Sequence, residues 1–135
     1  MRILVDTNVA LDVYLKREPF ANESLKAMQK ASKSGNSVFF SCSAITDFYY
    51  LSKKNLNGKE QALEFVINLT NHVRLAEVNK KIIYSSFASP IKDYEDAVID
   101  EVANSINADY ILTRNKKDFE HSKVKAITPK EFLTI

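Results

Sequence analysis

Cysteine, glycine, proline and long apolar runs are all scarce in this sequence of 135 residues. Its single cysteine, Cys42, excludes an intrachain disulfide and a zinc site built from several cysteines, so a reducing compartment is the simplest fit. Only two glycines and three prolines interrupt the chain, and it contains no linker-like stretch, low-complexity tract or internal repeat. The sequence therefore predicts one domain that spans residues 1–135.

No apolar run is long enough to cross a membrane, because a charged residue always follows within a few positions. The chain begins Met1-Arg2-Ile3-Leu4-Val5-Asp6, which places an acid where a signal peptide would have its apolar core. We therefore expect a cytoplasmic protein without a membrane partner.

A strong excess of charge of one sign is also missing, since 19 basic and 17 acidic residues leave a net charge of +2. The overall charge therefore does not indicate a nucleic-acid binder. The lysines and arginines nevertheless form small groups, and an acidic centre with basic surroundings would suit a polyanion held by its phosphates. Ordinary solubilising surface is the alternative, and charge alone favours it.

Strand-like and helical segments alternate along the chain. Short apolar runs predict strands at residues 3–5, 37–41, 73–78 and 110–112. Apolar residues at helical spacing predict helices at residues 7–15, 20–35, 43–51, 61–69, 82–87 and 93–106, with one more at the tail, capped by Thr128 and Glu131. The alternation predicts an α/β fold, a single-domain three-layer α/β/α sandwich with a central, mostly parallel sheet.

Four separate stretches place an acid where an apolar run stops. Asp6 follows the first predicted strand, Asp47 and Asp96 lie near the starts of predicted helices, and Asp118 follows the strand at 110–112. Because the carboxyl ends of parallel strands share one edge of the sheet, the four carboxylates can meet there. They would then repel one another unless divalent cations lay between them. Each acid alone could instead be a helix cap or a surface charge.

The residues next to these acids have alternatives of the same kind. Asp93 is the expected cap of the helix that carries Asp96, and Glu95 is expected to be solvated. Asp100 either joins the site or forms a surface pair.

The loop after residue 112 combines a hydroxyl, three cations and Asp118. The cations Arg114, Lys116 and Lys117 could hold phosphates while Asp118 serves a metal ion. The alternative is a polar surface turn with Phe119 in the core.

Taken together, these segments resemble the PIN domain family, small metal-dependent ribonucleases that include the VapC-type toxins of bacterial toxin-antitoxin pairs. The resemblance covers nearly the whole chain. Its motifs are the opening strand with Asp6-Thr7-Asn8, Ser43-Ala44-Ile45-Thr46-Asp47, Tyr94-Glu95-Asp96-Ala97, and residues 109–115 followed by Asp118-Phe119. The chain departs from the family in carrying Asp47 where most members have glutamate, and Asn115 where many have an acid.

The resemblance implies an RNA-cleaving enzyme in which Asp6, Asp47, Asp96 and Asp118 bind Mg²⁺ or Mn²⁺ as the catalytic carboxylates. It further implies a homodimer and a small antitoxin partner. The residues that would orient ligands or water are Asn8, Thr113 and Asn115. Those that would contact the RNA backbone are Arg114, Lys116 and Lys117. Because Asn115 brings no charge, one or two metal ions both stay open, and so does the RNA that is cut.

Two other functions stay open from the sequence. An aspartate-nucleophile phosphatase would also place an aspartate after the first strand, but phosphatases of the haloacid dehalogenase type need a second aspartate where this chain has Asn8. The other is a non-catalytic RNA- or protein-binding domain with a degenerate site, which the uncharged Asn115 suggests.

Overall fold

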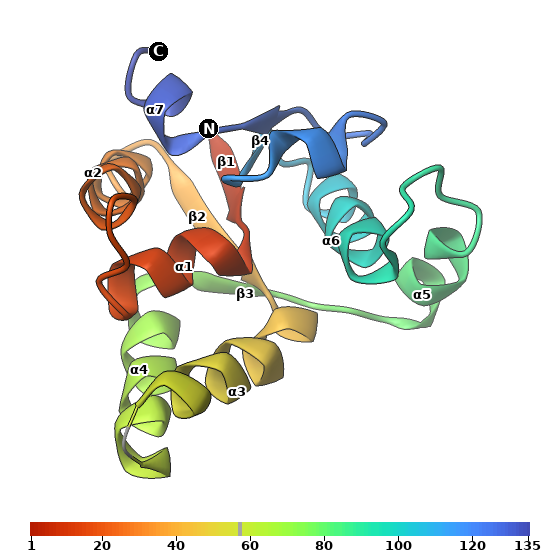
Figure 1. Ribbon diagram of the computed structural model, residues 1–135. Coiled ribbons are helices and arrows are strands. Elements are labelled where there is room, and N and C mark those ends of the chain that lie inside the picture. The colour runs from red at the N-terminus through yellow and green to blue at the C-terminus, as the bar shows by residue number, and fades with distance from the viewer. Residues whose placement is uncertain (57) are drawn as a thin grey trace.

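A five-stranded sheet in the order β3-β2-β1-β4-β5 forms the centre of the computed structural model, which describes residues 1–56 and 58–135 (Figure 1). Its strands are β1 (Arg2–Val5), β2 (Ser37–Ser41), β3 (Arg74–Ala76), β4 (Tyr110–Leu112) and β5 (Ala126–Ile127). All four pairings between neighbouring strands are parallel, so the predicted α/β fold is confirmed.

Helices pack on both sides of this sheet. In Figure 1, α1 to α4 lie on one side of β1 and α5 and α6 on the other. The α-helices of the described residues are α1 (Thr7–Tyr14), α2 (Ala21–Ala31), α3 (Ile45–Asn55), α4 (Lys59–His72), α5 (Lys80–Ser86), α6 (Tyr94–Ser105) and α7 (Pro129–Phe132). Two short 3-10 helices, η1 (Cys42–Ala44) and η2 (Lys116–Phe119), follow β2 and β4. No helix in the described part of the chain has the length and apolar character that spanning a membrane requires.

Strands β1 and β4 position Asp6, the first residue of the candidate site. Leu4 in β1 and Ile111 in β4 are fully buried, as expected for parallel strands covered on both faces. Val5 pairs with Leu112 in the same register. The next residue, Asp6, donates its backbone N–H to the carbonyl of Leu112 at 2.9 Å. Strand pairing therefore brings Asp6 beside Thr113, although 107 positions separate them.

The structure tests several local predictions. The side chain of Asp6 is the N-cap of α1, so the capping role considered for this acid is confirmed. Helix α3 begins at Ile45 rather than at residue 43, and Ser41 accepts the N–H of Ser43 and caps η1. The second helix ends at Ala31, short of the predicted stop at residue 35.

At the tail, the predicted capping box at the start of α7 is confirmed, since the side chains of Thr128 and Glu131 each accept a backbone N–H of the other. Strand β5 was not predicted.

Candidate active site at the carboxyl edge of the sheet

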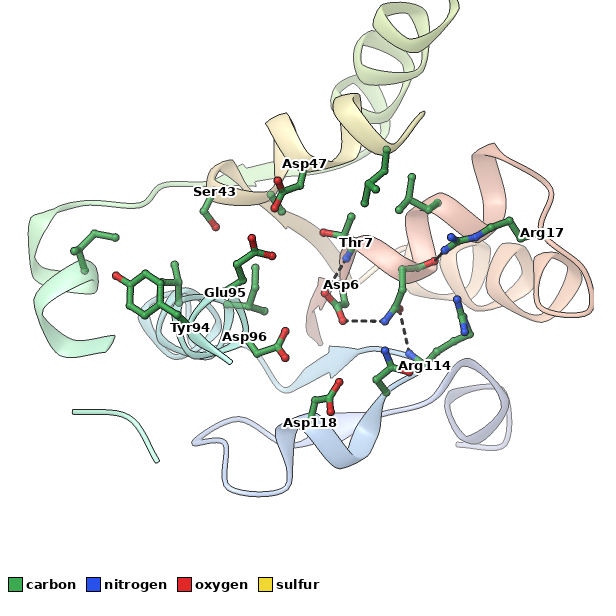
Figure 2. Close-up of a pocket in the computed structure, with 18 residues that line it drawn as sticks. Asp6, Thr7, Arg17, Ser43, Asp47, Tyr94, Glu95, Asp96, Arg114 and Asp118 are labelled. Carbon is green, nitrogen blue, oxygen red and sulfur yellow. Dashed lines mark hydrogen bonds between the residues drawn. The ribbon is translucent and has the colours of Figure 1, made fainter. Parts of the chain in front are cut away.

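A pocket of about 570 Å³ opens at the carboxyl edge of the sheet, and all four predicted aspartates line it (Figure 2). Asp6 directly follows β1, and Asp118 lies in η2 beyond β4. Asp47 and Asp96 each lie in the first turn of a helix, α3 and α6 respectively. The structure thus brings together four acids that are distributed along almost the whole chain.

Asp6 is the most buried and the most firmly held of the four. Its Oδ1 accepts the backbone N–H of Thr7 at 2.8 Å, and its Oδ2 accepts the Thr113 hydroxyl at 2.8 Å. The Asn8 side chain donates to the same Oδ2 at 3.2 Å. Burial raises the pKa of the Asp6 carboxyl, and the hydrogen bonds from Thr113 and Thr7 act against that rise. Asp6 is therefore a helix cap and a pocket residue at once.

Asn8 and Thr113 also connect the loop after β4 to Asp6. The Oδ1 of Asn8 accepts the backbone N–H of Arg114 at 3.2 Å, and the Thr113 hydroxyl accepts the backbone N–H of Asn115 at 3.1 Å. Thr113 is fully buried, and Asn115 lines the pocket. These contacts give Asn8 and Thr113 the geometry needed to orient Asp6.

Charge repulsion is concentrated at Asp96. Burial together with the nearby carboxylates of Asp6, Asp93, Asp118 and Glu95 raises the pKa of Asp96 to about 7. Near neutral pH this side chain therefore carries a proton in part of the molecules.

Glu95 is exposed, as expected, and it also lines the pocket. Figure 2 shows it between Asp47 and Asp96. The nearby carboxylate of Asp47 is the largest cause of its raised pKa. The sequence feature that could have predicted this fifth acid is its position next to Asp96 in the first turn of α6.

The acids of the pocket come close in places without forming one tight cluster. Among the described residues, no group of three or more His, Cys, Asp or Glu side chains is clustered tightly enough to hold a metal ion. The pocket offers several carboxylates and the amide of Asn115, which are oxygen donors of the kind that Mg²⁺ and Mn²⁺ prefer.

A family model described as PIN domain matches residues 2–117 of the sequence. The chain belongs to the PIN domain family. The resemblance noted from its motifs is thereby confirmed. No curated protein gives a significant match to the sequence.

Solved structures similar to this PIN domain come from toxin-antitoxin systems. VapBC2 from Rickettsia felis, bound to a DNA fragment from its promoter, has a TM-score of 0.77 and 15% identity over 95% of this chain and 98% of that chain. A toxin-antitoxin complex from Klebsiella pneumoniae has a TM-score of 0.73 and 22% identity, covering 94% and 97% of the two chains. VapC20 from Mycobacterium tuberculosis, a toxin that cleaves the sarcin-ricin loop, has a TM-score of 0.65 and 16% identity over 81% and 86%. At identities this low, the structural similarity shows a shared fold alone.

The cations predicted to contact RNA occupy three different settings in this PIN domain. Arg114 lines the pocket, but its guanidinium pairs with buried Asp12. Lys116 forms an ion pair with Glu131 at 2.8 Å. Lys117 is exposed and lines, with Lys116, a second hollow of about 650 Å³ rather than the carboxylate pocket. The three cations therefore do not form one group around the acids.

Asp93 and Asp100 have structural roles in this PIN domain. The Oδ1 of Asp93 accepts the backbone N–H of Asp96 at 3.1 Å, which confirms it as the cap of α6. Asp100 is buried outside the pocket and accepts the backbone N–H groups of Lys123 and Val124 at 2.9 and 3.1 Å. Both roles considered for Asp100, a member of the site or half of a surface pair, are therefore wrong.

Proposed function

We propose that this protein is an endoribonuclease that requires Mg²⁺ or Mn²⁺ and hydrolyses phosphodiester bonds in RNA. The observation that carries the proposal is the single pocket that Asp6, Asp47, Asp96 and Asp118 line from four separate segments. Membership of the PIN domain family supports it, since nuclease activity is general in that family.

The residues of the pocket fit a divalent cation. The carboxylates and the Asn115 amide offer oxygen donors. Burial and, after it, repulsion from neighbouring carboxylates raise the pKa of Asp96, and a positive ion would relieve that repulsion. Asp6 and Asp96 would carry the main ion, Asp47 and Asp118 would complete the site, and Asn115 would add a neutral donor. When bound, such an ion activates water and neutralises the charge that develops on a phosphate during hydrolysis.

The protein's own groups prepare Asp6 for this role. The hydrogen bonds from Thr7, Asn8 and Thr113 fix the rotation of the carboxylate before any ligand arrives. Preset orientation of a ligand lowers the cost of binding. Asn8, which donates to Asp6, occupies the position where a phosphatase of the haloacid dehalogenase type needs a second aspartate, and this argues against the phosphatase alternative.

RNA would reach the pocket past the loop that carries η2. Lys117 is exposed and has no ion pair within the described ranges, so its ammonium group is available to a phosphate. Arg114 would contact RNA only through the N–H groups that its pair with Asp12 leaves over. Lys116 would first have to leave Glu131.

We further propose that the enzyme is the toxin of a toxin-antitoxin pair, acts as a homodimer and is held inactive by a small antitoxin protein. The similarity to VapBC2 from Rickettsia felis and to a toxin-antitoxin complex from Klebsiella pneumoniae supports this role. Because VapC20 is a sarcin-ricin loop cleaving toxin, a structured RNA loop is a sound first substrate to test.

The test is cleavage of end-labelled RNA by the purified protein. Wild-type protein should cut a structured loop or a single strand in Mg²⁺ or Mn²⁺, and chelation with EDTA should stop the reaction. Asp6→Asn should lower the rate by at least about 100-fold, because even residues that only support metal ligands cost 10–100-fold when replaced. Glu23→Gln removes the same charge from an exposed site on α2 and should leave the rate unchanged. Equal rates for wild type and Asp6→Asn would refute the proposed site.

A non-catalytic RNA-binding domain is the second candidate. It is favoured by the uncharged Asn115 and by the lack of a tight metal cluster among the residues that the structure describes. RNA binding that persists in EDTA, with no cleavage in either metal, would support this candidate over the nuclease.

A further inference from the structure

Asp12 is a fully buried carboxylate in α1 that lies outside the pocket and that sequence reasoning did not identify. Two guanidinium groups converge on it. The Nε of Arg114 lies 2.7 Å from Oδ2 and its Nη2 lies 3.2 Å from Oδ1, while the Nε of Arg17 lies 3.0 Å from Oδ1. The Ser24 hydroxyl donates to Oδ2 at 3.3 Å. Four donor contacts on one buried carboxylate make a rigid anchor.

Arg114 is held at two further points. Its guanidinium carbon lies 3.9 Å from the centre of the Phe20 ring, and its backbone N–H is bound by Asn8. Asn8 and Asp12 are four residues apart on α1, so they lie one turn apart on one helix face. Asn8 therefore holds the backbone of Arg114, and Asp12 holds its side chain.

These contacts act on residues 113–118, the segment that carries one of the four predicted carboxylates of the pocket. Within residues 113–118, Thr113 donates to Asp6, Asn115 lines the pocket, and Asp118 supplies a carboxylate. Pairing with β1 ends at Leu112, and β5 holds the segment at its first residue, where the backbone N–H of Thr113 donates to the carbonyl of Ile127 at 3.0 Å. Asn8 and Asp12 tie the segment to α1 through their contacts with Thr113 and Arg114.

We propose that Asp12 is a positioning residue for the metal site. Through Arg114 it fixes the distance between the 113–118 segment and Asp6, and thereby the affinity of the pocket for a divalent cation. A buried, bidentate ion pair suits this role because its directions are fixed, whereas its net contribution to stability is small. The inference rests on the proposed function, since it concerns the same pocket.

The primary experiment measures Mn²⁺ binding to RNA-free protein by isothermal titration calorimetry. Asp12→Asn removes the charge of the anchor with little change of shape, and Arg114→Lys keeps the charge but loses the bidentate geometry. Each should weaken Mn²⁺ binding by about 10-fold or more, as replacements behind metal ligands do. The double variant should bind Mn²⁺ about as tightly as whichever single variant has the lower affinity, because both changes break the same connection.

The matched control is Asp100→Asn. Asp100 is also a buried carboxylate that anchors a loop, and it shares α6 with Asp96, but it holds the backbone at Lys123 and Val124 outside the pocket. This variant should lower the melting temperature and leave the dissociation constant for Mn²⁺ within about 2-fold of wild type. In cleavage assays, Asp12→Asn should need more metal for half-maximal rate and recover much of kcat at saturating metal.

Unchanged Mn²⁺ affinity in Asp12→Asn, or an equal loss in Asp100→Asn, would overturn the proposal. If circular dichroism shows that Asp12→Asn is unfolded, Arg114→Lys decides by the same criterion. Wild-type protein that binds no Mn²⁺ would instead refute the metal site of the proposed function. Normal Mn²⁺ binding by wild type with unaffected variants would refute only the role of Asp12.

Discussion

At the scale of single residues, the raised pKa of Asp96 shows that the pocket lowers the stability of the metal-free fold near neutral pH. An isolated aspartate has a pKa of 3.8, whereas burial and neighbouring carboxylates raise the pKa of Asp96 to about 7 in the folded chain. Between these values the unfolded chain releases its proton while the folded chain keeps it. The stabilising contribution is therefore complete below the unfolded pKa and is lost as the pH rises toward about 7.

We expect the metal-free protein to melt at a lower temperature at about pH 7.5 than at about pH 5.5, because of this proton linkage. Asp96→Asn should raise the melting temperature at the higher pH and reduce the difference between the two. Some difference should remain, because the pKa values of Asp6, Glu95 and Asp100 are raised as well. The measurement is thermal melting in EDTA across the pH range, with Glu23→Gln as the exposed control. An undiminished difference in Asp96→Asn would contradict the assigned repulsion.

At the scale of elements, Phe119 anchors the carboxyl end of η2 in the core. Phe119 is 3% exposed and belongs to the main hydrophobic core, while the preceding residue, Asp118, lines the pocket. A helix of four residues has too few hydrogen bonds to form on its own. Burial of Phe119 therefore holds Asp118 at the site.

Phe119→Ala should lower the free energy of unfolding by about 3–5 kcal/mol, and Phe119→Leu should cost clearly less, because it leaves a smaller cavity. Urea denaturation measures both. Tyr84→Ala is the matched control, since Tyr84 is an aromatic residue that is 68% exposed, and its loss should cost little. Equal costs for Phe119→Ala and Tyr84→Ala would show that η2 is not anchored in this way.

Helices and strands that are marked by a local run of apolar residues or by a capping residue could be predicted from the sequence. Those that depend on pairing with a distant segment could not. The apolar runs of β1 and β4 and the Asp93 cap of α6 are local features. By contrast, β5 has only two residues and is defined by pairing with β4. The same limit applies to the site: the four acids could be found at the ends of elements, whereas Asp12 and Arg114 are 102 positions apart. The only local sign was a charge at residue 12 within an otherwise apolar stretch of α1.

At the scale of the whole molecule, the pocket joins segments that the sheet and helices otherwise connect only indirectly. Its acids come from the loop after β1, from α3, from α6 and from η2, and thus from residues 6 to 118. The unfolded chain cannot present these carboxylates together. A cation that binds them would therefore stabilise the whole fold rather than one loop.

Mn²⁺ should accordingly raise the melting temperature of the wild-type protein, and EDTA should reverse the effect. At a free concentration of about 100 times the dissociation constant, the linkage gives about 2.7 kcal/mol, which corresponds to roughly 10 °C for a domain of this size. Asp6→Asn should lose most of this shift because it removes the best-oriented ligand, whereas Glu23→Gln should keep it. Differential scanning calorimetry across a Mn²⁺ series provides the measurement. A shift of equal size in Asp6→Asn would mean that the metal stabilises the protein from somewhere other than this pocket.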